Sequence, residues 1–165
     1  MKKVILGLAL CSGLLLAGCS SDTTNKSSDT TTESTTVDSV ENVVLKDGTY
    51  KLEEKNYNNL YRYILTMDIK DNTIEKVDFD AIDKEGNSKR EDESYIKMME
   101  EQSGTSPDKF LDELQESLLE KQNPDDVDTV TGATHTTDSF KEYAKELIKQ
   151  AEKGDTSTII VDNKN

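Results

Sequence analysis

Cysteine and histidine are scarce in this chain of 165 residues. Its cysteines, Cys11 and Cys19, both lie close to the N-terminus, and His135 is the single histidine. The rest of the chain therefore cannot form an internal disulfide. It also cannot bind haem or an iron-sulfur cluster through thiolates, or build a histidine-rich zinc site. Any redox chemistry must come from an organic cofactor.

Tryptophan is absent, and apolar residues make up only 33% of the chain, so the core must be small. Basic residues are also few: 20 against 34 acidic residues, which gives a formal net charge of -14 at pH 7. Such a surface repels nucleic acid and anionic lipid, so we expect no nucleic-acid partner. The length allows one modest domain.

The one long apolar run is at the N-terminus. Residues 1–18 carry two lysines and then an apolar run that is too short to span a bilayer, which predicts a secretory signal peptide. The run ends in Leu16-Ala17-Gly18-Cys19, which resembles the lipobox of bacterial lipoproteins. The resemblance implies that Cys19 is lipidated and anchors the protein at the extracytoplasmic face of the cell membrane. The alternative is a free thiol in a cleaved leader, which predicts a fully secreted protein.

The next segment is built almost entirely from serine, threonine and aspartate. It has nothing from which to build a core, so residues 19–42 are expected to be the lipidated cysteine and a disordered tether. Residues 43–165 are then the single folded domain.

Strand patterns follow. Alternation of apolar and polar residues predicts a strand over 61–70 and a return strand over 74–81, joined by a turn at Asp71-Asn72. A turn signal at Asp47-Gly48 predicts an earlier strand entry. Residues 157–161 are expected to add a short edge strand.

Helical patterns occupy the second half. Tyr95, Met98 and Met99 predict a helix that breaks at Ser103-Gly104, and another helix begins at Ser106-Pro107 and stops before Asn123. We interpret the apolar stripes of both as core.

The last helix is expected to begin at a capping box, Ser139 to Glu142, and to stop at Gly154. The fold class is therefore α+β, a small antiparallel sheet packed with about three helices.

Small residues gather just before the last helix, where residues 128–134 read DTVTGAT. We expect a short strand through Val127 and Val130 to lead into this turn. A helix N-terminus offers unpaired N–H groups and a positive dipole, which favour phosphate. These groups point to a phosphate-bearing ligand without identifying one. The alternative is an ordinary strand-to-helix turn, which uses the same residue types.

The longer pattern is more specific. Asp128, Thr131, Gly132, Ala133 and Thr134 match the flavinylation motif Asp-x-x-(Ser/Thr)-Gly-Ala-Thr. With weaker similarities in residues 46–50 and 90–99 and at Pro107, the chain resembles the FMN-binding domain family. It is most similar to the small lipoprotein branch, whose members are linked to extracellular electron transfer and to peptide-pheromone precursors.

The resemblance implies that a flavin transferase, using FAD and magnesium, joins FMN through its phosphate to the hydroxyl of Thr134. Asp128 and Thr131 would serve recognition and hydrogen bonding, while Gly132 and Ala133 would leave room for the phosphate and the transferase. The attachment turn would lie between the short strand and the last helix. The protein would carry electrons from a membrane quinol-linked donor to extracellular acceptors. No nucleophile-base pair is apparent, so we expect an electron carrier and not an enzyme.

Several alternatives stay open. One alternative is a non-catalytic surface lipoprotein whose signal peptide yields a secreted peptide pheromone, and another is a flavin reductase module that acts in trans. Tyr50, Tyr57 and Tyr61 are candidates either for stacking on the flavin or for packing on a strand face. His135 either hydrogen-bonds the phosphate or is an exposed turn residue. The acidic runs at 91–93 and 125–126 are either weak calcium sites or solvated loops, with the loops favoured.

Overall fold

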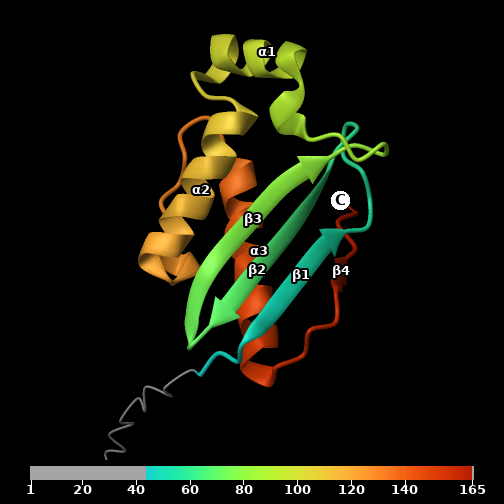
Figure 1. The fold of residues 1–165 in the computed structure, drawn as a ribbon. Helices are drawn as coiled ribbons and strands as arrows, with labels where there is room; N and C mark the ends of the chain where they lie inside the picture. The colour runs from blue at the N-terminus through green and yellow to red at the C-terminus, as the bar shows by residue number, and fades with distance from the viewer. Residues whose placement is uncertain (1–43, 165) are drawn as a thin grey trace, which may run out of the picture. The chain divides into compact units, whose positions relative to one another are not determined.

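Residues 44–164 are described by the computed structural model, and they form a sheet with two long helices on one face (Figure 1). The predicted signal peptide, Cys19 and the tether lie outside the described residues. In chain order the elements are β1 (Gly48–Glu54), β2 (Arg62–Lys70), β3 (Thr73–Ile82), a 3-10 turn (Lys89–Glu91), α1 (Glu93–Ser103), α2 (Pro107–Lys121), a second 3-10 turn (Pro124–Asp126), α3 (Thr134–Lys153) and β4 (Ile159–Val161). The α+β class is confirmed.

The sheet has the order β3-β2-β1-β4. β1, β2 and β3 form an antiparallel meander, as predicted, and its tight turn uses Asp71 and Asn72 at φ values of 49° and 63°. β4 is the predicted edge strand, but it pairs parallel to β1, so the complete sheet is mixed.

Alternate side chains of the three long strands face α2 and α3 and form the core. Tyr50, Leu65 and Phe79 are fully buried there, together with Leu114 and Leu147 from the two helices. The predicted stripe of α2 is therefore confirmed as core. The C-terminal ends of α1 and α3 also lie where the sequence predicts them, since Gly104 and Gly154 close these helices in the left-handed conformation.

The stripe of α1 is not core, which corrects our interpretation. No residue of α1 is buried, and Met98 is 40% exposed. In Figure 1, α1 stands beyond one end of the sheet instead of lying across its face. Tyr95 and Met99 consequently face a cavity, as described below.

Two further expectations are wrong. α3 begins at Thr134, five residues before the proposed capping box at Ser139, and residues 127–130 form no strand. The cause is Thr137, whose buried hydroxyl accepts a hydrogen bond from Val130 N–H (3.2 Å) and donates one to Ala133 O (3.0 Å). These two bonds fold the chain into the first turn of the helix earlier than the local signature indicates.

Within residues 44–164, no helix has both the length and the hydropathy required to cross a bilayer.

Candidate functional site

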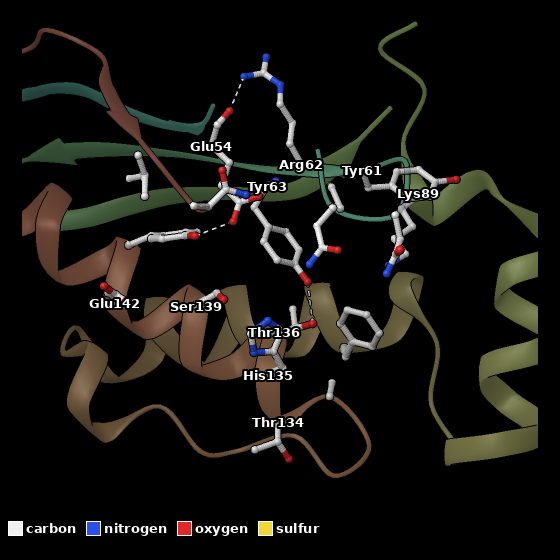
Figure 2. A pocket seen from close by; sticks show the side chains of 18 of the residues that line it. Glu54, Tyr61, Arg62, Tyr63, Lys89, Thr134, His135, Thr136, Ser139 and Glu142 are labelled. Atoms are coloured by element: carbon white, nitrogen blue, oxygen red, sulfur yellow. Dashed lines mark hydrogen bonds between the residues drawn. The ribbon is translucent and has the colours of Figure 1, made fainter. Parts of the chain in front are cut away.

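A cavity of 570 Å³ opens between the sheet and the beginning of α3. This volume is within the range of about 300 to 1,000 Å³ that is usual for small-molecule sites. Side chains of β1, β2, the 3-10 turn Lys89–Glu91, α1 and α3 converge on it (Figure 2). Its lining includes Glu54, Tyr61, Arg62, Tyr63, Lys89, Tyr95, Met99, Gly132, Ala133, Thr134, His135, Thr136, Tyr143 and Lys164.

Thr134 lies at the rim of this cavity, as the first residue of the 20-residue helix α3. Its side chain is exposed, and in Figure 2 it lies below His135 on the outer side of the turn. The N-cap position is Ala133, which has no side-chain acceptor for the first N–H groups of the helix. These N–H groups have no partner within the helix, so they are available to an anion.

Gly132 is required by the geometry of the turn. Its φ is +82°, and a Cβ at this position would lie 2.8 Å from Ser103 O and 3.1 Å from Thr105 Cγ2. Any side chain would therefore push the turn away from the loop between α1 and α2. The glycine of the motif thus has an internal packing role, in addition to any room it leaves for a ligand.

The loop before the turn is held by a lysine of α3. Lys141 Nζ donates to Asp125 O (3.1 Å) and Val127 O (2.8 Å). The loop and the turn of the motif are therefore both anchored to α3.

The five residues of the predicted site divide into two groups. Gly132, Ala133 and Thr134 line the cavity, whereas Asp128 and Thr131 do not. The side chain of Asp128 is 88% exposed and accepts a hydrogen bond from Lys121 Nζ at 2.5 Å, which lowers the pKa of the carboxyl. Asp128 and Thr131 therefore face solvent, where a partner protein can reach them.

A buried carboxylate forms part of the sheet side of the cavity. Glu54 is only 5% exposed, and its two oxygens accept hydrogen bonds from Tyr143 Oη (2.6 Å) and Tyr63 N–H (2.7 Å). Burial and this contact raise the pKa of Tyr143. The Tyr63 hydroxyl lies 2.9 Å from Thr136 Oγ1 on α3. These bonds tie the ends of β1 and β2 to α3 around the cavity.

Aromatic faces form the opposite end. Tyr61 and Tyr95 line the cavity there, and Lys89 Nζ lies 5.2 Å and 4.0 Å from their ring centroids. The Tyr61 hydroxyl donates to Asp92 Oδ2 at 2.8 Å. Burial and this hydrogen bond raise the pKa of Tyr61 to about 12.

The three tyrosines proposed from the sequence have different environments. Tyr50 is fully buried in the core and donates to Lys46 O, so it cannot stack on a ligand in the cavity. Tyr57 does not line the cavity, and Tyr61 does. Tyr63 and Tyr95 were missed as cavity residues. Tyr63 belongs to the alternating pattern of a strand, and Tyr95 has the spacing of a helix face. Both patterns indicate a packing surface, and no sequence signal tells whether that surface faces the core or a cavity.

His135 lines the cavity and is exposed, as expected for the second residue of α3. Among residues 44–164, no group of three His, Cys, Asp or Glu side chains is arranged to hold a metal ion.

Together, these features suit a ligand with a flat ring and a phosphate. The aromatic faces of Tyr61, Tyr63 and Tyr95 can pack against a ring. The uncapped N-terminus of α3 suits the phosphate, and the cavity has the volume of a cofactor site.

Comparison with known proteins agrees with this chemistry. The chain is 34% identical over 117 residues to the "15 kDa lipoprotein" of Treponema pallidum (strain Nichols), an alignment that covers 70% of this chain and 83% of that protein. A crystal structure of a Clostridium perfringens protein is similar in fold, with a TM-score of 0.70 and 32% identity, over 73% of this chain and 100% of that one. Residues 57–149 match the FMN-binding domain. The chain therefore belongs to the FMN-binding domain family and is a flavin-binding protein.

Proposed function

We propose that this protein is an electron carrier in which FMN is joined through its phosphate to Thr134 Oγ1. The observation that carries the proposal is the position of Thr134. It is the first residue of α3, at the rim of the cavity, beside N–H groups that no side chain caps. A phosphate on this hydroxyl would lie where the helix dipole favours negative charge.

The attachment is the work of a separate flavin transferase that uses FAD and magnesium. A bond forms between Thr134 Oγ1 and the phosphorus of the FMN half of FAD, and the pyrophosphate linkage breaks. AMP leaves with the bonding electrons, and the hydroxyl proton goes to a base of the transferase. Magnesium neutralises the charge of the pyrophosphate. Exposure of Thr134, Thr131 and Asp128 supports this scheme, because the enzyme must reach all three.

Each part of the chain then has a role toward the cofactor. Bound FMN supplies the electron-transfer chemistry, while the protein binds and orients it. The N–H groups at the start of α3 bind the phosphate. Tyr61, Tyr63 and Tyr95 offer faces to the ring, and the Glu54–Tyr143 hydrogen bond holds the wall of the cavity in place.

The carrier operates outside the cytoplasmic membrane, anchored by lipid on Cys19. The lipobox and the lipoprotein relative support this location. Electrons come from a membrane quinol-linked donor and pass to extracellular acceptors. A covalent link suits an exported carrier, because a dissociated FMN would be lost to the medium. Replacing Cys19 by serine should move the protein from the membrane fraction to the medium.

The test is expression of the full chain with and without a flavin transferase, followed by in-gel flavin fluorescence. Wild type should fluoresce only when the transferase is present, and Thr134→Ala should not fluoresce at all. Thr129→Ala is the matched control, because Thr129 is an exposed threonine of the same loop at an unspecified position of the motif. A dark wild-type band, beside a control substrate that the transferase labels, would overturn the proposal.

A further inference from the structure

Lys89 is a cation that no acidic side chain neutralises in the described part of the chain. Its Nζ lies over the rings of Tyr95 (4.0 Å) and Tyr61 (5.2 Å). None of the salt bridges or hydrogen bonds found among residues 44–164 includes this ammonium group. Aromatic faces attract a cation through their quadrupoles without cancelling its charge. The full positive charge of Lys89 thus remains available to a ligand.

The backbone that carries Lys89 is fixed to the sheet on both sides. Ser88 Oγ bonds Asp80 Oδ1 (2.9 Å) and accepts from Arg90 N–H (3.1 Å). Arg90 also donates to Phe79 O at 3.0 Å. Both neighbours of Lys89 are therefore bonded to β3 or to each other, which anchors the backbone from which the lysine side chain reaches the cavity wall.

The ammonium group points into the hollow between the sheet and α3 (Figure 2). The other charged side chains that line the cavity are paired or exposed: Asp162 is paired with Lys55 (3.4 Å), and Glu142 is exposed on α3. Glu54 uses both oxygens on Tyr143 and Tyr63, and Arg62 is paired with Glu53 at 2.8 Å. Lys164 is exposed near the end of the chain. Lys89 is therefore the cation at the aromatic end of the cavity, where the carboxylate of Asp92 accepts the hydrogen bond of the Tyr61 hydroxyl.

We propose that Lys89 binds the reduced flavin in preference to the oxidised flavin and so raises the midpoint potential of the carrier. This inference rests on FMN occupying the cavity, as in the proposed function. Uptake of two electrons from a donor and one proton from solvent converts neutral oxidised isoalloxazine into a ring with one negative charge. A cation in a partly buried site attracts that charge and leaves the neutral oxidised ring almost unaffected. Charge near the ring is one of the means by which a protein tunes a flavin.

The first test compares the flavin midpoint potential of the full-length flavinylated protein with that of two variants. Lys89→Gln removes the charge and should lower the potential, by about 30 mV if the preference for reduced flavin falls about tenfold. Lys89→Arg keeps the charge and should stay close to wild type. Lys84→Gln is the matched control, because Lys84 also lies over a tyrosine ring, 5.8 Å from the centroid of Tyr57, but does not line the cavity.

The second test does not depend on covalent attachment. Free FMN, oxidised or reduced with dithionite, is titrated into full-length Thr134→Ala with and without Lys89→Gln. Loss of Lys89 should raise the Kd of the reduced form about tenfold more than that of the oxidised form.

Equal weakening of both forms, or an unchanged potential in Lys89→Gln, would overturn the inference, because a purely structural lysine acts on both oxidation states alike. If wild type carries no adduct but the Kd ratio still depends on Lys89, the covalent attachment fails and the role of Lys89 stands. If neither form of FMN binds and wild type carries no adduct, both proposals fail; if the adduct forms, the midpoint potential of Lys89→Gln decides the role of Lys89.

Discussion

Tyr143 of α3 and Glu54 of β1 are joined by a hydrogen bond of 2.6 Å that spans the wall of the cavity. The second Glu54 oxygen is used by Tyr63 N–H, so a nearly buried carboxylate has both oxygens satisfied by protein groups. This arrangement couples the stability of the fold to the shape of the cavity.

Tyr143→Phe should therefore destabilise the protein. The change keeps the ring in the core but leaves one Glu54 oxygen buried without a donor, which is expected to lower the free energy of unfolding by about 1–3 kcal/mol. Urea denaturation measures the loss. Tyr50→Phe is the comparison, because it removes only a hydroxyl bonded to the backbone carbonyl of Lys46, worth about 0.5–1.5 kcal/mol. A smaller loss for Tyr143→Phe than for Tyr50→Phe would contradict this account of Glu54.

The raised pKa of Tyr61 predicts that the folded protein loses stability at alkaline pH. Its pKa in the folded protein is about 12, above the ordinary value of 10.0, through burial and its hydrogen bond to Asp92. A raised pKa means that the folded state holds the proton more tightly, so this contribution is complete below pH 10 and disappears as the pH rises toward 12. The unfolding free energy of Tyr61→Phe should fall less steeply than that of wild type across this window. Parallel curves would show that Tyr61 is not coupled to folding.

Gly132 and Gly86 allow the strain of the motif to be measured. Both have positive φ, +82° and +88°, but a Cβ would clash with Ser103 O only at position 132, while nothing lies within 4 Å at position 86. Gly86→Ala should cost about 1 kcal/mol through backbone strain alone. Gly132→Ala should cost more in a urea titration and should also reduce FMN attachment, since the turn must shift. Equal losses of stability would mean that the loop between α1 and α2 yields freely.

Asp128 should matter for attachment and not for stability. Its side chain is 88% exposed and its ion pair with Lys121 is at the surface, so Asp128→Asn is expected to leave the unfolding free energy close to that of wild type. The same variant should lose most of its flavin fluorescence after co-expression with the transferase. Asp138→Asn, at an exposed aspartate in the first turns of α3, is the control and should be labelled like wild type.

The meander and the C-terminal ends of α1 and α3 were predictable because each depends on local chemistry. Period-two alternation identified β2 and β3, and Asp71-Asn72 and Gly154 adopt the positive φ values that these residue types tolerate. The parallel pairing of β4 with β1 was not predictable, since it joins segments more than 100 residues apart.

The errors at the site have a tertiary cause. The Ser139–Glu142 signature describes a local cap, whereas the true start of α3 depends on Thr137 bonding back to Val130 and Ala133. Likewise, the apolar residues of α1 have the spacing of a core helix, but Tyr95 and Met99 line the cavity. The sequence motif located Thr134, and only the three-dimensional arrangement brought Glu54, Lys89 and Tyr95 to the same cavity.

The most direct measurement of the central claim is the site of the adduct. After co-expression with the transferase, trypsin releases the peptide of residues 122–141, which contains the threonines at 129, 131, 134, 136 and 137. Fragmentation in the mass spectrometer should place one FMN, less one water, on Thr134 alone. An unmodified peptide from cells with an active transferase, or FMN on another threonine, would contradict the account.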